Sequence, residues 1–199
     1  MFYNIIKGIL YLLFKITLRL EVRGQENIPA SGALVIASNH ISLLDPPVLG
    51  TCATRKVHFM AKQELFVPVL GTIYRLLGAF PVRRGGADRA AIKHGLEILQ
   101  NKHCLAIFPE GTRSKTGLLG KAEPGALMLA GKTNAVIVPA CVMGTDIKRC
   151  GRLWPKVQVR FGKPLYFPEG ALNKEVLRQH SDTLMERIAA LQEDIRNGN

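Results

Sequence analysis

The sequence predicts an α/β fold, a single layered domain with a mostly parallel central sheet flanked by helices, preceded by an N-terminal amphipathic helical segment that associates with a membrane. Three observations predict it. Short, fully apolar runs recur along the chain, helical segments with an apolar stripe lie between them, and no repeat or long linker divides the 199 residues. The expected boundaries are residues 1–22 for the helical segment and 23–199 for the main domain.

The first expected element is a helix over residues 2–20. Lys7, Lys15 and Arg19 interrupt its apolar run, so it lacks the roughly 20 uninterrupted apolar residues of a membrane span, and no small-residue cleavage site follows. At about 100° per residue, one face is polar and the opposite one apolar. The polar face holds Asn4, Lys7, Tyr11, Lys15 and Arg19, and the apolar face holds Ile5, Ile6, Ile9, Leu12, Leu13, Ile16 and Leu20. Two main alternatives follow: a helix lying in a membrane interface with its lysines toward the headgroups, or a helix packed on the protein's own core. A true span or a cleaved signal is the third and more remote alternative.

The remaining elements follow in alternation after a connection at residues 21–32. Four short apolar runs are typical of strands buried on both faces, whereas a fifth alternates and suits an edge strand. The buried strands are expected at residues 33–37, 57–61, 104–108 and 135–142, and the edge strand at 157–161. Helices are expected at residues 67–77, 88–100, 124–132 and 174–195.

Composition restricts the classes of partner. The chain is 47% apolar, which is too high for intrinsic disorder, and its 27 Lys and Arg exceed 15 Asp and Glu to give a net charge of +12. Such an excess implies a nucleic acid, an anionic membrane surface or a phosphorylated substrate. The four cysteines form no CxxC pair and no His lies at metal-ligand spacing, so we expect reduced thiols and no metal site.

The first segment with chemical potential is Asn39-His40-Ile41-Ser42-Leu43-Leu44-Asp45, which leaves the first apolar strand. Pro46 is well placed to open a helix, so Asp45 falls near the N-cap and a turn can return its carboxylate to the imidazole of His40. Such a pair can deprotonate a hydroxyl, with His as the base and Asp fixing its tautomer. The spacing alone leaves open a capping Asp beside an incidental His.

The second segment is Phe108-Pro109-Glu110-Gly111-Thr112-Arg113-Ser114, which follows the strand at 104–108. Ligands of open α/β sheets bind at the carboxyl ends of strands. Arg113 can bind a phosphate through two parallel hydrogen bonds, and Gly111 lets the backbone approach closely. Glu110 has two candidate roles: orienting Arg113 or accepting a hydrogen bond from a substrate hydroxyl.

These two segments together resemble the glycerolipid acyltransferase family, typified by the 1-acyl-sn-glycerol-3-phosphate (lysophosphatidic acid) acyltransferases. Lesser blocks agree: residues 78–84 are similar to the family's arginine block, with Arg84 at the substrate-contacting position, and Lys62 is similar to a lysine common in the family. Two positions depart from the pattern. Arg83 stands where relatives usually carry an acidic residue, and Glu123 where they usually carry Lys.

The resemblance implies an O-acyltransferase in which residues 23–199 form the catalytic domain. His40 and Asp45 would be catalytic, and the acceptor and its phosphate would be bound by Glu110, Gly111, Thr112, Arg113, Arg84 and Lys62. The expected reaction transfers an acyl group from acyl-CoA or acyl-carrier protein to the sn-2 hydroxyl of lysophosphatidic acid, without a further cofactor. Alternatives are glycerol 3-phosphate or another lysophospholipid as acceptor and, more remotely, a non-catalytic basic protein that binds lipid or nucleic acid.

The expected partners are an anionic membrane surface, the lysophospholipid and the acyl thioester, with acyl-carrier protein as an alternative donor. The expected location is peripheral or monotopic on the cytoplasmic face of a membrane, such as a bacterial inner membrane. Nucleic acid is not expected, because each half of the chain carries +6, aromatic residues are only 7%, and no nucleic-acid motif is present. Residues 148–163, with six cations around Trp154, are either a second membrane-facing patch or an ordinary basic loop and edge strand.

Overall fold

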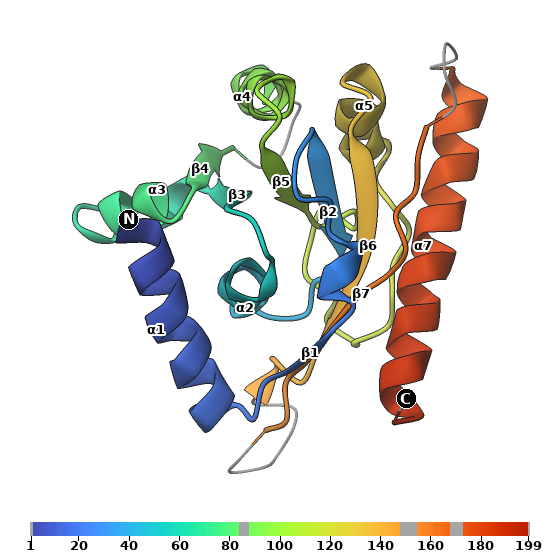
Figure 1. Cartoon of the computed structure of the whole chain (residues 1–199). Coiled ribbons are helices and arrows are strands. Elements are labelled where there is room, and N and C mark those ends of the chain that lie inside the picture. The colour runs from blue at the N-terminus through green and yellow to red at the C-terminus, as the bar shows by residue number, and fades with distance from the viewer. Residues whose placement is uncertain (1, 84–87, 148–154, 168–172, 199) are drawn as a thin grey trace.

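A computed structural model describes residues 2–83, 88–147, 155–167 and 173–198 of the chain. Its centre is a seven-stranded sheet of order β1-β7-β6-β2-β5-β3-β4, in which every neighbouring pair is parallel except β6 with β7 (Figure 1). The strands are β1 (Glu21–Arg23), β2 (Leu34–Ser38), β3 (Val57–Lys62), β4 (Ala79–Val82), β5 (Cys104–Ile107), β6 (Val136–Met143) and β7 (Gln158–Phe161). The mostly parallel α/β architecture expected from the sequence is confirmed.

Helices cover both faces of this sheet. They are α1 (Phe2–Thr17), α2 (Asp45–Cys52), α3 (Leu70–Leu76), α4 (Arg89–Gln100), α5 (Pro124–Lys132) and α7 (Lys174–Arg196), with short 3₁₀ turns at Gln25–Asn27 and Gln63–Leu65. One core lies between the sheet and α1 with α2, and the other between the sheet and α4, α5 and α7 (Figure 1). Strand β2 serves both cores, because Leu34 and Ile36 point into the first and Val35 and Ala37 into the second. Burial on both faces explains why its sequence is apolar throughout.

Two strands were not expected from the sequence. β1 lies within the predicted connection at 21–32, and β4 lies in the stretch noted only for its arginines. β1 pairs with the outer side of β7, so the prediction that residues 157–161 form an edge strand is wrong. The alternation of β7 instead reflects Arg160, which is 6% exposed and ion-paired to Glu21 of β1. A charged residue within a buried strand imitates the pattern of a strand with one wet face.

The N-terminal helix packs partly on the protein's own core, one of the alternatives left open by its sequence, and the interfacial alternative stays a prediction. α1 packs beside α2 through a narrow strip that includes Leu10, Tyr11 and Phe14, while its broad apolar face is exposed. The exposed members of that face are Phe2, Ile5, Ile9, Leu12, Leu13 and Ile16. Lys7, expected to reach lipid headgroups, turns inward and its Nζ donates a hydrogen bond to the carbonyl oxygen of Ala53. Burial there lowers the pKa of Lys7.

None of the helices in the described part of the chain is long and apolar enough to cross a membrane. Cys52, Cys104 and Cys141 are free and buried, and burial raises the pKa of each thiol to about 12. These thiols are therefore neutral and unreactive packing residues. Cys150 and the first part of the basic stretch at 148–163, residues 148–154, lie outside the described residues.

Candidate active site

The carboxyl ends of the parallel strands bring the two predicted motifs to one edge of the sheet. β2 leads into Asn39 and His40, β5 leads into Phe108 and Glu110, and the two strands are direct neighbours in parallel register. Parallel neighbours end at the same edge, which is where open α/β sheets bind ligands. His40 and Glu110, 70 residues apart in the sequence, are therefore close enough to form a hydrogen bond.

His40 and Asp45 form the expected pair. His40 Nδ1 lies 2.8 Å from Asp45 Oδ2, and the two side chains are 8% and 0% exposed. Asp45 is the first residue of α2, and its Oδ2 also accepts the backbone N–H groups of Ile41 at 2.6 Å and Ser42 at 2.7 Å. With Nδ1 donating to the carboxylate, Nε2 is the ring nitrogen left with a lone pair for a substrate proton. The Asp45 carboxylate thus both folds the turn and orients the base.

Phe108 supports the imidazole from one side. Its ring stacks on that of His40, with centroids 4.0 Å apart and an interplanar angle of 19°. The stacked ring limits rotation of the imidazole about its χ angles and keeps water from that face. Phe108, which the sequence analysis assigned only to the end of a strand, is therefore part of the site.

Glu110 takes a different role from the two considered in the sequence analysis. Its Oε1 accepts the backbone N–H of His40 at 3.1 Å, and its Oε2 accepts the backbone N–H of Gly120 at 2.9 Å. The backbone N–H of Ser114 in turn donates to the carbonyl oxygen of His40 at 2.8 Å. The two bonds to His40 fasten the loop of residues 109–120 to the segment that carries the base, and the bond to Gly120 closes the loop on itself.

The candidate phosphate ligands lie on the open side of this loop. Gly111 has φ +67°, a conformation that favours glycine, and Gly111, Thr112 and Arg113 are exposed. Among the described residues, no carboxylate lies within ion-pair distance of Arg113. Its guanidinium group is therefore available to an anion from solvent.

The other two predicted ligands differ in status. Lys62 ends β3 at the same edge of the sheet, but its Nζ is 3.3 Å from Glu64 Oε1, so its described ion pair is internal. Arg84 lies outside the described residues, although β4, which precedes it, is parallel to β3 and ends at this edge. Its neighbour Arg83 donates from Nε to Gln63 Oε1 at 2.9 Å.

Two site residues were missed by the sequence reasoning. Asn39 clamps β2 to β6, because its Nδ2 donates to the Val142 carbonyl at 2.9 Å and its Oδ1 accepts the Val142 N–H at 2.8 Å. Thr145, just beyond β6, donates its hydroxyl to Asp45 Oδ1. A buried Asn at a strand end was a signal for the first, whereas only the fold places Thr145 beside Asp45.

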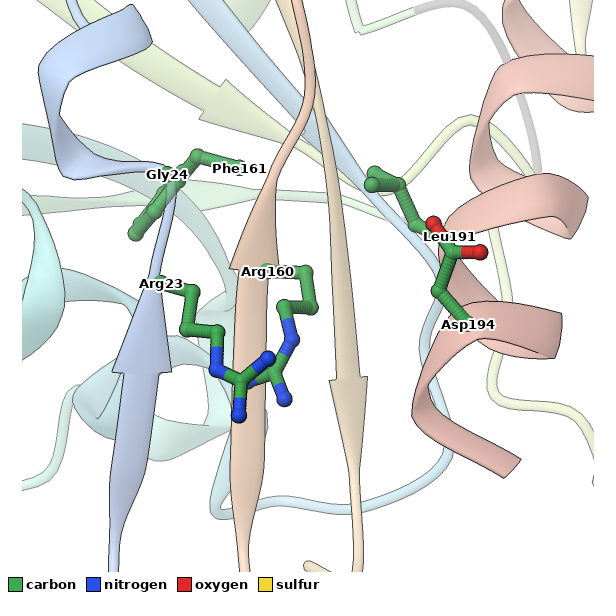
Figure 2. A pocket seen from close by; sticks show the side chains of 6 residues that line it. All are labelled: Arg23, Gly24, Arg160, Phe161, Leu191 and Asp194. Atoms are coloured by element: carbon green, nitrogen blue, oxygen red, sulfur yellow. The ribbon is translucent and has the colours of Figure 1, made fainter. Parts of the chain in front are cut away.

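One cavity lies on another side of the molecule from these residues. It has a volume of about 270 Å³ and is lined by Arg23, Gly24, Arg160, Phe161, Leu191 and Asp194 (Figure 2). The guanidinium groups of Arg23 and Arg160 lie side by side there, both within ion-pair distance of Glu21 Oε1. None of its lining residues belongs to the His40 site, so this cavity is separate from the candidate chemistry.

Comparison with known proteins gives consistent results. A family model described as "Acyltransferase" matches residues 19–143. A 1-acyl-sn-glycerol-3-phosphate acyltransferase of Bacillus subtilis is 31% identical over 176 residues, covering 86% of this chain and 87% of that protein. The chloroplastic enzyme LPAT1 of Arabidopsis thaliana is 35% identical over 131 residues. The chain spans only about a third of that plant relative and under half of a similar one from Brassica napus.

A solved structure is also similar. The 1-acyl-sn-glycerophosphate (LPA) acyltransferase PlsC from Thermotoga maritima superposes with a TM-score of 0.78 at 28% identity, covering 96% of this chain and 78% of that one. The matched family segment contains His40, Asp45, Glu110 and Arg113. The sequence matches, the fold and the site geometry are therefore all consistent with an acyltransferase.

Proposed function

The chain belongs to the acyltransferase family, and from that premise we propose that it acylates the sn-2 hydroxyl of 1-acyl-sn-glycerol 3-phosphate to form phosphatidic acid. The observation that carries the proposal is the buried His40–Asp45 pair, 2.8 Å apart, at the edge of the sheet beside the exposed Arg113. The relatives named 1-acyl-sn-glycerol-3-phosphate acyltransferase favour this acceptor.

His40 begins the reaction as the general base. Its Nε2 takes the proton of the acceptor hydroxyl as the oxygen attacks the thioester carbonyl of acyl-CoA or acyl-carrier protein. Asp45 stabilises the resulting imidazolium through Nδ1. As the tetrahedral intermediate collapses, a C–O bond has formed, the C–S bond breaks, and the proton passes from His40 to the departing thiolate. Because the thioester is already activated, these steps balance without a further reactant.

Arg113 supplies the acceptor's charge recognition in this scheme. Its guanidinium group binds the phosphate, and Arg84, which follows β4 in the sequence, is the second candidate cation. Gly111 and Thr112 precede Arg113 in the exposed part of the same loop, which Glu110 holds in place. Lys62 adds to the positive electrostatic potential of the site when its ion pair with Glu64 breaks.

The lipid acceptor and the shape of α1 together suggest where the protein works. We propose that the exposed apolar face of α1 lies in the interface of an anionic membrane, with Lys15 and Arg19 toward the headgroups. The net charge of +12 favours such a surface. The cytoplasmic leaflet, where acyl thioesters are available, is the proposed side.

A radiolabelled transfer assay with purified protein and mixed vesicles tests the proposal. Lysophosphatidic acid and glycerol 3-phosphate are compared as acceptors, each with acyl-CoA and with acyl-carrier protein. Labelled phosphatidic acid from lysophosphatidic acid is the expected product. If only glycerol 3-phosphate is acylated, the acceptor assignment is wrong, and if neither is, the activity is wrong.

A further inference from the structure

The second oxygen of the Asp45 carboxylate has a partner far away in the sequence. Asp45 Oδ1 accepts the hydroxyl of Thr145, 100 residues further along the chain. Both residues are essentially inaccessible, with Asp45 0% and Thr145 1% exposed. A buried carboxylate oxygen requires a donor, so this hydrogen bond is one that the site depends on.

Thr145 is held in place by the framework of the sheet rather than by the loop it begins. The end of β6 is clamped to β2 by the two hydrogen bonds between Asn39 and Val142. Gly144 follows with φ +84°, and a Cβ atom there would lie 2.1 Å from the Lys156 carbonyl oxygen. The turn therefore needs glycine and leads to Thr145 in one direction only.

We propose that Thr145 is a positioning residue for the His40–Asp45 pair. The inference rests on the proposed function, and Thr145 lies beyond the segment matched by the family model, which ends at residue 143. Three N–H donors reach Oδ2, and the Thr145 hydroxyl holds Oδ1. The carboxylate plane is then fixed at both ends, which keeps Oδ2 aligned with Nδ1 and Nε2 aimed at the acceptor hydroxyl.

Among the described residues, two further groups lie close to the pair. From the loop after β5, Glu110 accepts the backbone N–H of His40. From β6, Cys141 is near Asp45, and burial raises the pKa of its thiol to about 12, so it stays neutral in an assay.

Two matched pairs of proteins test the role of the hydroxyl. Wild type and Thr145→Val differ mainly in that group, and so do Thr145→Ser and Thr145→Ala. We expect the hydroxyl-free member of each pair to lose about tenfold in kcat, with KM for acceptor within about twofold. Thr51→Val is the control. Thr51 lies on α2, the helix that begins with Asp45, and its buried hydroxyl donates to the carbonyl oxygen of Val48 instead of to Asp45.

A proton NMR measurement separates this inference from the proposed function. The resonance of the His40 Nδ1–H bonded to Asp45 should be retained in Thr145→Ser and shifted or lost in Thr145→Val, whether or not the assay has the right acceptor. An unchanged kcat and an unchanged resonance in both hydroxyl-free variants would overturn the inference and leave the function intact. If both hydroxyl-free variants fail to fold while Thr145→Ser folds, Thr145 is structural and the inference fails.

Discussion

Which nitrogen of His40 remains free decides what this residue can do. Nδ1 is bound to Asp45, which itself receives two further N–H donors and the Thr145 hydroxyl. The backbone of the same residue is held by Glu110 and Ser114, and its ring by Phe108. An imidazole restrained on its ring, its Nδ1 and its backbone presents Nε2 in a single direction, as a general base requires.

We expect His40→Ala to lower kcat about 10²- to 10⁴-fold, because proton removal then falls to water. The measurement is the transfer assay, with circular dichroism to show that the variant is folded. His94→Ala is a matched control, since His94 is an exposed histidine on α4. Activity of a folded His40→Ala protein within tenfold of wild type would contradict the assignment.

We expect Arg113→Ala to raise the KM for lysophosphatidic acid about 10- to 100-fold while kcat changes little, because a charge-assisted contact to the phosphate is lost. Arg178→Ala provides the comparison, since Arg178 is an exposed arginine on α7 paired with Glu175. An unchanged acceptor KM in Arg113→Ala would exclude this residue from the phosphate site.

At the level of elements, the loop of residues 109–120 is positioned by a carboxylate rather than by its own regular structure. Glu110 accepts N–H groups from both His40 and Gly120, and each bond joins the loop to itself or to β2's exit. A Gln side chain at this position has one acceptor oxygen, and its NH₂ group would face an N–H donor. The substitution therefore removes one of the two ties at constant size.

We expect Glu110→Gln to lower kcat about tenfold and to speed amide hydrogen exchange in residues 111–120, because about 1 kcal/mol of hydrogen bonding to a backbone N–H donor is lost. Hydrogen exchange followed by mass spectrometry reports the loop directly. Glu97→Gln, on the exposed face of α4, serves as the neutral comparison. Unaltered exchange in this loop would show that Glu110 does not hold it.

The N-terminal helix is a second element whose exposed side chains require an explanation. Ile9 and Leu12 of α1 are 59% and 61% exposed, while Phe14 of the same helix is buried against the domain. Insertion of a large apolar side chain into lipid contributes about 1.5–3 kcal/mol. We expect Ile9→Ser with Leu12→Ser to reduce flotation with anionic vesicles at least tenfold.

The vesicle experiment has a clear control and a clear failure. Tyr166→Ser changes another exposed apolar residue, 67% exposed and outside any helix, and should float like wild type. The double variant should keep its thermal midpoint, because both side chains face away from the core. Equal flotation of the double variant and wild type would show that the face of α1 does not bind lipid.

At the level of the whole molecule, a cluster of ion pairs joins the edge strand β1 to its neighbour β7. Glu21 of β1 lies 2.8 Å from Lys156 Nζ and 2.8 Å from Arg160 Nη2, and Arg23 adds a third cation at 3.3 Å. Hydrogen bonds from Lys156 and Arg160 lower the pKa of Glu21 to about 2. The cluster joins β1, which follows α1, to the approach to β7, so it links the N-terminal segment to the domain.

This cluster predicts an acid-sensitive part of the stability. The pKa of Glu21 is depressed in the folded state, so its stabilising contribution is complete above about pH 4.5 and is lost as the pH falls toward about 2. We expect Glu21→Gln to be less stable than wild type at pH 7, by about 1 kcal/mol, and equal to it near pH 2. Urea denaturation at a series of pH values measures the difference, and a gap that persists at pH 2 would contradict it.

The sequence by itself determined what depends on neighbouring residues. Short apolar runs predict the buried strands, and His40 and Asp45 are close enough along the chain for one turn to bring them together. The combination of the two sequence motifs identified the family by resemblance, and the family model confirms it. Local pattern is sufficient wherever the partners are separated by a single turn.

Only the tertiary structure decided the contacts that span the chain. Thr145 meets Asp45 across 100 residues, Glu110 meets His40 across 70, and Arg160 meets Glu21 across 139. Each of these pairs depends on strand order and register, which the sequence alone does not give. For the same reason, the sequence analysis predicted that β7 is an edge strand and that Lys7 faces lipid headgroups, whereas β7 is flanked by two strands and Lys7 bonds to Ala53. The physical reason is that a buried polar group is satisfied by whichever donor or acceptor the packed strands bring to it, at any distance along the chain.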